Sequence, residues 1–211
     1  MRRHLASTLF AIGLASGCSN TVLVDVPPRM DLRPYGPLGI IEFASNSTAQ
    51  VNVQATRQFQ EQVQAAQPGT PFIELGSREA VLAAVGHRQL DAAALRAIGA
   101  KYGIAALFVG EIAYSEPKAD IRINDLTKLD GSVRAEIRGD VSSRLFDTKS
   151  GAAVWTSSAW AKKPLGGVVM SAERGVSAGV RNSDPRSEMV PTLLYHLTRD
   201  FRPSTVRQPA N

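Results

Sequence analysis

The spacing of apolar residues divides this chain into a first half of helices and short strands and a second half of alternating strands. In the first half, apolar residues recur at helical spacing, and glycine and proline delimit short apolar runs between them. A helix followed closely by a glycine and an apolar strand indicates an α/β layer, because a short link returns the chain directly to the sheet. The predicted strands are 38–43, 71–75 and 104–112, and the predicted helices are 49–66, 78–85 and 92–102.

Strict alternation replaces this pattern in the second half. Over residues 133–145 the odd positions are apolar or small, whereas the even positions carry charged or polar side chains. This alternation predicts a long antiparallel strand with one dry face and one charged face. Turn residues at 146–151 lead into a partner strand over 152–161, in which Trp155 and Trp160 lie five positions apart and therefore face opposite sides.

The end of the chain is less regular. Residues 162–187 are rich in glycine, serine and charge, and they predict a mobile loop. A final helix over 188–201, with Pro191 in its tolerant first turn, carries one apolar stripe. The stripe consists of Val190, Leu193, Leu194, Leu197 and Phe201. We expect it to pack on the sheet of its own domain rather than on a neighbouring subunit.

The first residues have the organisation of a secretory signal peptide. Arg2 and Arg3 precede an apolar run over 5–14, which is too short for a membrane span, and small residues then lead to Cys18. Cys18 is the only cysteine of the chain, so no disulfide can form within it. An ordinary secreted protein with a stray cysteine is the alternative interpretation.

Residues 14–18, Leu-Ala-Ser-Gly-Cys, resemble the lipobox of bacterial lipoproteins. The resemblance implies that the Cys18 thiol receives a diacylglycerol, that residues 1–17 are removed, and that acyl chains anchor the mature chain in a membrane. Ser19 stands where similar inner-membrane lipoproteins carry aspartate, which favours the outer membrane and a domain that faces the periplasm.

The mature chain has the size and charge of a tethered globular domain. Removal of Arg2 and Arg3 lowers the number of basic residues from 24 to 22, against 19 acidic residues, and this balance does not argue for nucleic-acid binding. The expected division is a signal peptide at 1–17, a lipidated, proline-rich flexible tether at 18–37, one domain at 38–201 and a frayed tail at 202–211. The predicted fold class is α/β (α+β), with a mixed sheet, helices packed on it, an antiparallel hairpin in the second half and a C-terminal helix.

One catalytic pattern occurs, because residues 175–179 spell the G-x-S-x-G nucleophile elbow of hydrolases around Ser177. Asp184 and His196 follow in the hydrolase order. The elbow requires an apolar strand that leads into the serine, and none precedes Ser177, so we expect a glycine-rich loop and keep a serine hydrolase only as a remote alternative. His87 and His196 have no partners at ligand spacing, which predicts no metal site and no cofactor. The sequence therefore predicts a protein that is not an enzyme.

The order of the elements resembles the amino-terminal domain shared by the CsgG curli-secretion lipoproteins, TolB and the penicillin-binding-protein activator LpoB. The matching pieces are the strand at 40–43 with Asn46, the strand at Phe72, the helix that ends at Tyr102, the strand at 107–112, and the strand, turn and strand over 144–155. The resemblance implies a periplasmic domain that binds proteins and, in CsgG itself, a ring whose hairpins build a channel.

The charged face of the predicted strand at 133–145 departs from the channel pattern, because its other face is needed to cover the core. Residues 162–187 could not cross a bilayer without exposing charge to lipid. We therefore expect a non-enzymatic adaptor that binds a protein partner in cell-envelope assembly or secretion. A CsgG-like secretion-channel subunit is the alternative, and association with further copies of the chain is left open.

Overall fold

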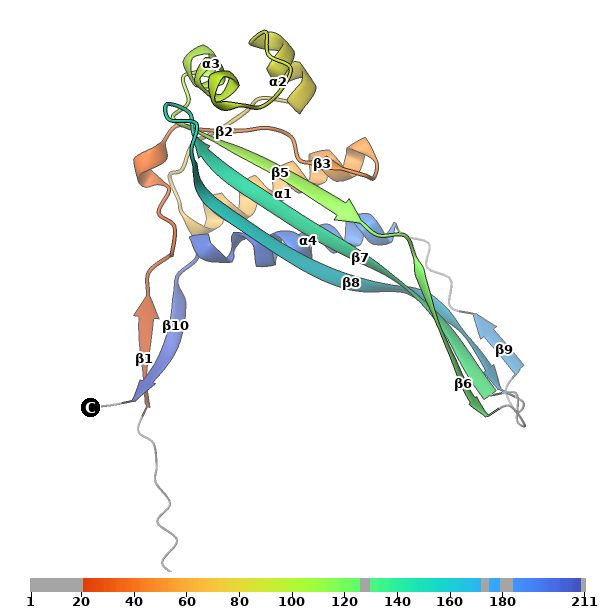
Figure 1. Cartoon of the computed structure of the whole chain (residues 1–211). Coiled ribbons are helices and arrows are strands. Elements are labelled where there is room, and N and C mark those ends of the chain that lie inside the picture. Colours follow the sequence, from red (N-terminus) through yellow and green to blue (C-terminus); the bar gives the residue numbers. More distant parts are fainter. Residues whose placement is uncertain (1–20, 126–129, 172–174, 179–183, 210–211) are drawn as a thin grey trace, which may run out of the picture. The chain divides into compact units, whose positions relative to one another are not determined.

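The computed structural model describes residues 21–125, 130–171, 175–178 and 184–209, which form two compact units. The smaller unit is a two-stranded antiparallel ribbon of β1 (Thr21–Val26) and β10 (Ser204–Pro209). The larger unit runs from Pro27 to Pro203 and contains an eight-stranded mixed sheet with helices packed on it (Figure 1). The predicted α+β class is therefore confirmed.

The first half of the chain builds the parallel part of the sheet, as its apolar periodicity predicts. β2 lies between β4 and β5, and β3 also pairs with β5. The hydroxyl of Ser77 and the carboxylate of Asp91 each accept a hydrogen bond from a backbone N–H of the next helix, which fixes where α2 and α3 begin. The elements are β2 (Leu38–Ile40), β3 (Ala44–Ser45), α1 (Ala49–Ala66), β4 (Phe72–Glu74), α2 (Arg78–Ala84), α3 (Ala92–Tyr102) and β5 (Ala106–Tyr114).

The second half contains the predicted antiparallel hairpin, and it is longer than expected. The strands are β6 (Lys118–Asp125), β7 (Asp130–Asp147), β8 (Ala153–Ser171) and β9 (Gly175–Ala178). The prediction of a mobile loop at 162–187 is wrong where β8 and β9 occupy it. A backbone ladder needs no large apolar side chains, and the irregular stretch around Pro164 and Gly166 is absorbed by a bulge opposite Ala135 and Glu136.

The C-terminal helix begins earlier than predicted. α4 (Pro185–Leu197) starts directly after Asp184, whose carboxylate accepts hydrogen bonds from the N–H groups of Arg186 and Ser187, and η2 (Thr198–Phe201) extends it. Pro191 therefore lies inside the helix and not in its first turn, which corrects its expected place. The prediction placed the start of the helix by its apolar stripe and missed the first turn, because that turn is polar. The first turn is set by the Asp184 cap and by Pro185 at the first helical position.

Two apolar clusters hold the larger unit together on opposite faces of the sheet. The main cluster joins α1 and α4 to the sheet, and all five stripe residues of the last helix are fully buried in it, so the prediction that the stripe packs on its own sheet is confirmed. At its centre, the ring centroids of Phe108 and Phe201 lie 6.0 Å apart, and those of Trp155 and Phe201 lie 4.7 Å apart. The second cluster packs α2 and α3 on Leu107 and Val109 of β5.

Both ends of the folded chain are more ordered than expected. β1 pairs with β10 in a register that places Val24 opposite Val206, where a flexible tether and a frayed tail were predicted. The valines at 22, 24 and 26 alternate as in a strand, but the prolines that follow them favoured a tether in the prediction. In the larger unit, Leu32 is fully buried and η1 (Arg33–Tyr35) follows it, so folded structure begins before residue 38. No helix among the described residues combines the length and the apolarity needed to span a bilayer.

Candidate interaction surface on the open face of the sheet

The helices α2 and α3 cover only part of one face of the sheet, and the rest of that face carries no helix in the described structure. The pairing of β5 with β7 and of β7 with β8 brings polar residues of all three strands side by side on this face. We call this surface the open face, and it comprises Glu111 and Ala113 of β5, Arg138, Asp140, Ser142 and Arg144 of β7, and Thr156, Ser158, Trp160 and Lys162 of β8. It is the charged face that the alternation over 133–145 predicts.

An exposed tryptophan and an arginine form the centre of the open face. The side chain of Trp160 is 57% exposed, whereas Trp155 is 8% exposed in the core, so the prediction of opposite orientations is confirmed. The guanidinium carbon of Arg138 lies 4.8 Å from the ring centroid of Trp160, and its Nη2 lies 2.6 Å from Oδ1 of Asp140. The hydrogen bond to Asp140 raises the pKa of Arg138 above its ordinary value. The cation is thus held over the indole ring.

The remaining charges of the open face are only partly neutralised. Nζ of Lys162 lies 2.6 Å from Oε1 of Glu136, and the hydroxyl of Ser142 donates a hydrogen bond of 3.3 Å to Glu111. Arg144, in contrast, has no ion pair with any residue that the structure describes. Because exposed ion pairs contribute about 0–1 kcal/mol each to stability, these charges are better suited to recognition than to holding the fold.

A hollow of about 250 Å³ continues the open face toward α2. Its cationic lining is Arg78 from α2 and Arg144 from β7, and Glu111 and Ser142 connect it to the region around Trp160. Sequence reasoning missed Arg78 as a member of this surface, since it lies on a helix distant from β7 in sequence. The cap residue Ser77 indicates that Arg78 begins a helix, but it does not indicate which strands that helix packs against.

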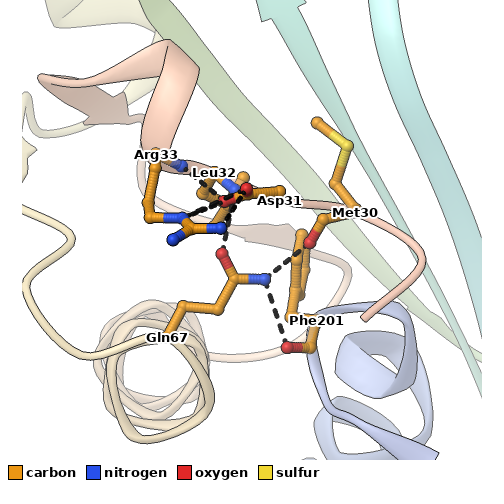
Figure 2. A network of polar contacts seen from close by, with 6 residues as sticks. All are labelled: Met30, Asp31, Leu32, Arg33, Gln67 and Phe201. Carbon is orange, nitrogen blue, oxygen red and sulfur yellow. Dashed lines mark hydrogen bonds and ion pairs between the residues drawn. The ribbon is translucent and has the colours of Figure 1, made fainter. Parts of the chain in front are cut away.

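A separate polar network joins two segments of the larger unit, residues 30–33 and η2, to the end of α1 (Figure 2). The side-chain amide of Gln67 donates hydrogen bonds to the carbonyl oxygens of Met30 (2.5 Å) and Phe201 (3.2 Å), and its oxygen accepts one from the N–H of Leu32 (2.8 Å). Beside it, the guanidinium of Arg33 lowers the pKa of Asp31. The network holds residues 30–32 against the end of α1 and against η2.

The structure does not assemble the residues of the serine-hydrolase pattern. Ser177 lies within β9, in register with Val169 of β8, and not at a turn from a strand into a helix. The carboxylate of Asp184 caps α4, whereas His196 lies twelve residues further along that helix, a rise of about 18 Å. A hydrogen bond between this aspartate and this histidine is therefore excluded.

Two other predictions concern lipid and metal. Cys18 and the signal peptide lie outside the described residues, so lipidation stays a prediction. Within the part of the chain that the structure describes, no three His, Cys, Asp or Glu side chains come together in a way that could hold a metal ion. His87 and His196 belong to no cluster of that kind.

Comparison by sequence finds no matching family model and no matching curated protein. Among solved structures, the chain is similar to the PelC dodecamer from Paraburkholderia phytofirmans, at 11% identity and a TM-score of 0.40 over 87% of this chain and 98% of that one. It is also similar to lipoprotein GNA1162 from Neisseria meningitidis (17% identity, TM-score 0.31, 60% and 82% covered) and to the C-terminal domain of LpoB from Salmonella enterica (9%, 0.34, 60% and 83%). At these identities each likeness concerns the fold alone.

Proposed function

We propose that this chain is a lipoprotein, anchored through Cys18 in the outer membrane and facing the periplasm, whose domain binds a protein partner in cell-envelope assembly or secretion. It carries out no catalysis. The observation that carries the proposal is the open face, on which Trp160 stands more than half exposed among charged residues. The lipobox-like sequence at 14–18 supports the anchor.

The composition of the open face suits protein recognition. Tryptophan and arginine are the residues most often found to dominate the energy of protein interfaces, and they do so where a partner removes them from water. Trp160 and Arg138 already contact each other, so little side-chain freedom is lost when a partner covers them. The β-sheet beneath them is rigid, since it is backed by the main apolar cluster under α4.

The charges of the face indicate an acidic partner surface. Arg138 and Lys162 are compensated by neighbouring carboxylates, but Arg144 and Arg78 have no ion pair with any described residue. A complementary surface would place carboxylates opposite them, which favours encounter and sets the orientation of the complex. We therefore expect a folded protein with an acidic patch.

Site-specific photocrosslinking in intact cells tests the proposal. A photoreactive phenylalanine analogue at Ser158, beside Trp160, should yield one discrete crosslinked species, and the same analogue at Gln64 on the exposed side of α1 should not. Trp160→Ala combined with Arg138→Ala should abolish that species without lowering the melting temperature, because both side chains are exposed. Equal crosslinking from both positions, or none from Ser158, would contradict docking on the open face.

A further inference from the structure

We infer that the hollow between α2 and the strands β5 and β7 is a binding site for a carboxylate group. It has a volume of about 250 Å³, which is the scale of one side chain and not of a large cofactor. Two guanidinium groups from different elements line it, Arg78 from the first position of α2 and Arg144 from β7. The fold thus brings together two cations that lie far apart in the sequence.

Arg78 has a buried donor that nothing in the described structure satisfies. Its Nε atom is shielded from solvent and has no hydrogen-bond partner. A buried donor left unpaired is costly, and folded proteins pair nearly all of them. Because water does not reach Nε in this conformation, an acceptor in the hollow pairs with Nε only when the Arg78 side chain turns toward it. Arg144 has no ion pair with any described residue and can donate to the same group. Both arginines are therefore available to one ligand.

The charge balance of the hollow selects a monoanion. Glu111 lines it together with the two arginines, and the hydroxyl of Ser142 holds that carboxylate by a hydrogen bond of 3.3 Å. Two positive charges and one negative charge leave room for a single further negative charge. A planar carboxylate also matches the paired N–H groups of a guanidinium.

The walls of the hollow add a preference for an alkyl-linked carboxylate. Leu90 and Phe146 line it beside the arginines and offer an apolar surface to the methylene groups that would carry the anion. An aspartyl or glutamyl side chain has this form. That the carboxylate comes from a protein partner rests on the proposed docking function, whereas the anion chemistry of the hollow does not.

The test observes the side-chain Nε–H resonance of Arg78 by ¹⁵N NMR, in the full chain with Cys18→Ser, and Arg78→Lys identifies the resonance by its loss. Acetate should shift this resonance with a Kd of roughly 1–10 mM, and neutral acetamide should not. Arg144→Gln should weaken acetate binding about tenfold, as expected for one lost charge-assisted contact. Arg57→Gln, which removes an exposed charge from α1, should leave it unchanged.

Three results would overturn the site: no shift at saturating acetate, an equal shift with acetamide, or tighter binding of dianionic phosphate than of acetate. A capped tripeptide with one central glutamate tests whether the carboxylate comes from a protein side chain or from a free small molecule. Binding of this peptide at least as tight as that of acetate supports a protein ligand, and binding of acetate alone refutes it. If the analogue at Ser158 gives no crosslinked species while acetate still binds, the docking function is refuted and the anion site is not.

Discussion

Replacement of Gln67 by alanine should destabilise the larger unit, because three backbone groups lose their partner at once (Figure 2). The amide group of Gln67 bonds the carbonyls of Met30 and Phe201 and the N–H of Leu32. A hydrogen bond contributes about 0.5–1.5 kcal/mol net, so three together amount to roughly 1.5–4.5 kcal/mol. The groups are partly buried and water reaches some of them after truncation, so we expect about 2–3 kcal/mol.

Urea unfolding of the chain without its lipid, followed by tryptophan fluorescence, measures this loss. Trp155 lies in the core close to Phe201 and reports on the region. The matched control is Gln64→Ala on the same helix, since Gln64 is exposed and makes one long hydrogen bond of 3.4 Å to the carbonyl of Thr70. It should change the free energy of unfolding by less than about 0.5 kcal/mol. If both variants unfold alike, the network does not hold the segment from residue 27 to the domain.

Four further outcomes are expected. Leu194→Ala should cost about 2–5 kcal/mol in thermal unfolding, and an unshifted melting temperature with a changed sedimentation coefficient would contradict its core position. Burial, with the nearby charge of Asp184, raises the pKa of Tyr114 to about 12, so an ultraviolet titration should show one tyrosine ionising late, and Tyr114→Phe should remove that step. The stability that the neutral phenol contributes is complete below about pH 10 and is lost as the pH rises toward 12. Cys18→Ala should abolish palmitate labelling, and labelling that persists would refute the lipid anchor. Ser177→Ala should leave fold and phenotype unchanged, and a fluorophosphonate probe that labels Ser177 specifically would place the protein among enzymes.

Periodicity predicts the elements that have a dry face and a wet face. The bounds of α1 agree with the prediction to the residue, and the apolar positions Val51, Ala55, Phe59 and Val63, which recur every four residues, are all buried. The opposite orientations of Trp155 and Trp160 follow from the two-residue period of a strand. The charged open face was predictable for the same reason.

Such patterns do not predict which strands pair when the strands lie far apart in the sequence. The outer part of β8 is held by backbone hydrogen bonds to β7, and glycines there carry no signal of burial. β1 and β10 lie almost 180 residues apart, so neither segment alone indicates its partner. The hollow at Arg78 depends on where α2 packs on the sheet, and the local sequence does not encode that position.

The early start of folded structure limits how far the larger unit can begin from Cys18. Only nine residue steps separate Cys18 from Pro27, where the larger unit begins, in place of the nineteen that a tether ending at residue 37 would provide. Fully extended, nine residues reach about 30 Å, roughly half the span of the longer tether. Under the proposed anchoring, Pro27 therefore lies within about 30 Å of the lipid-modified cysteine, whatever path residues 18–26 follow.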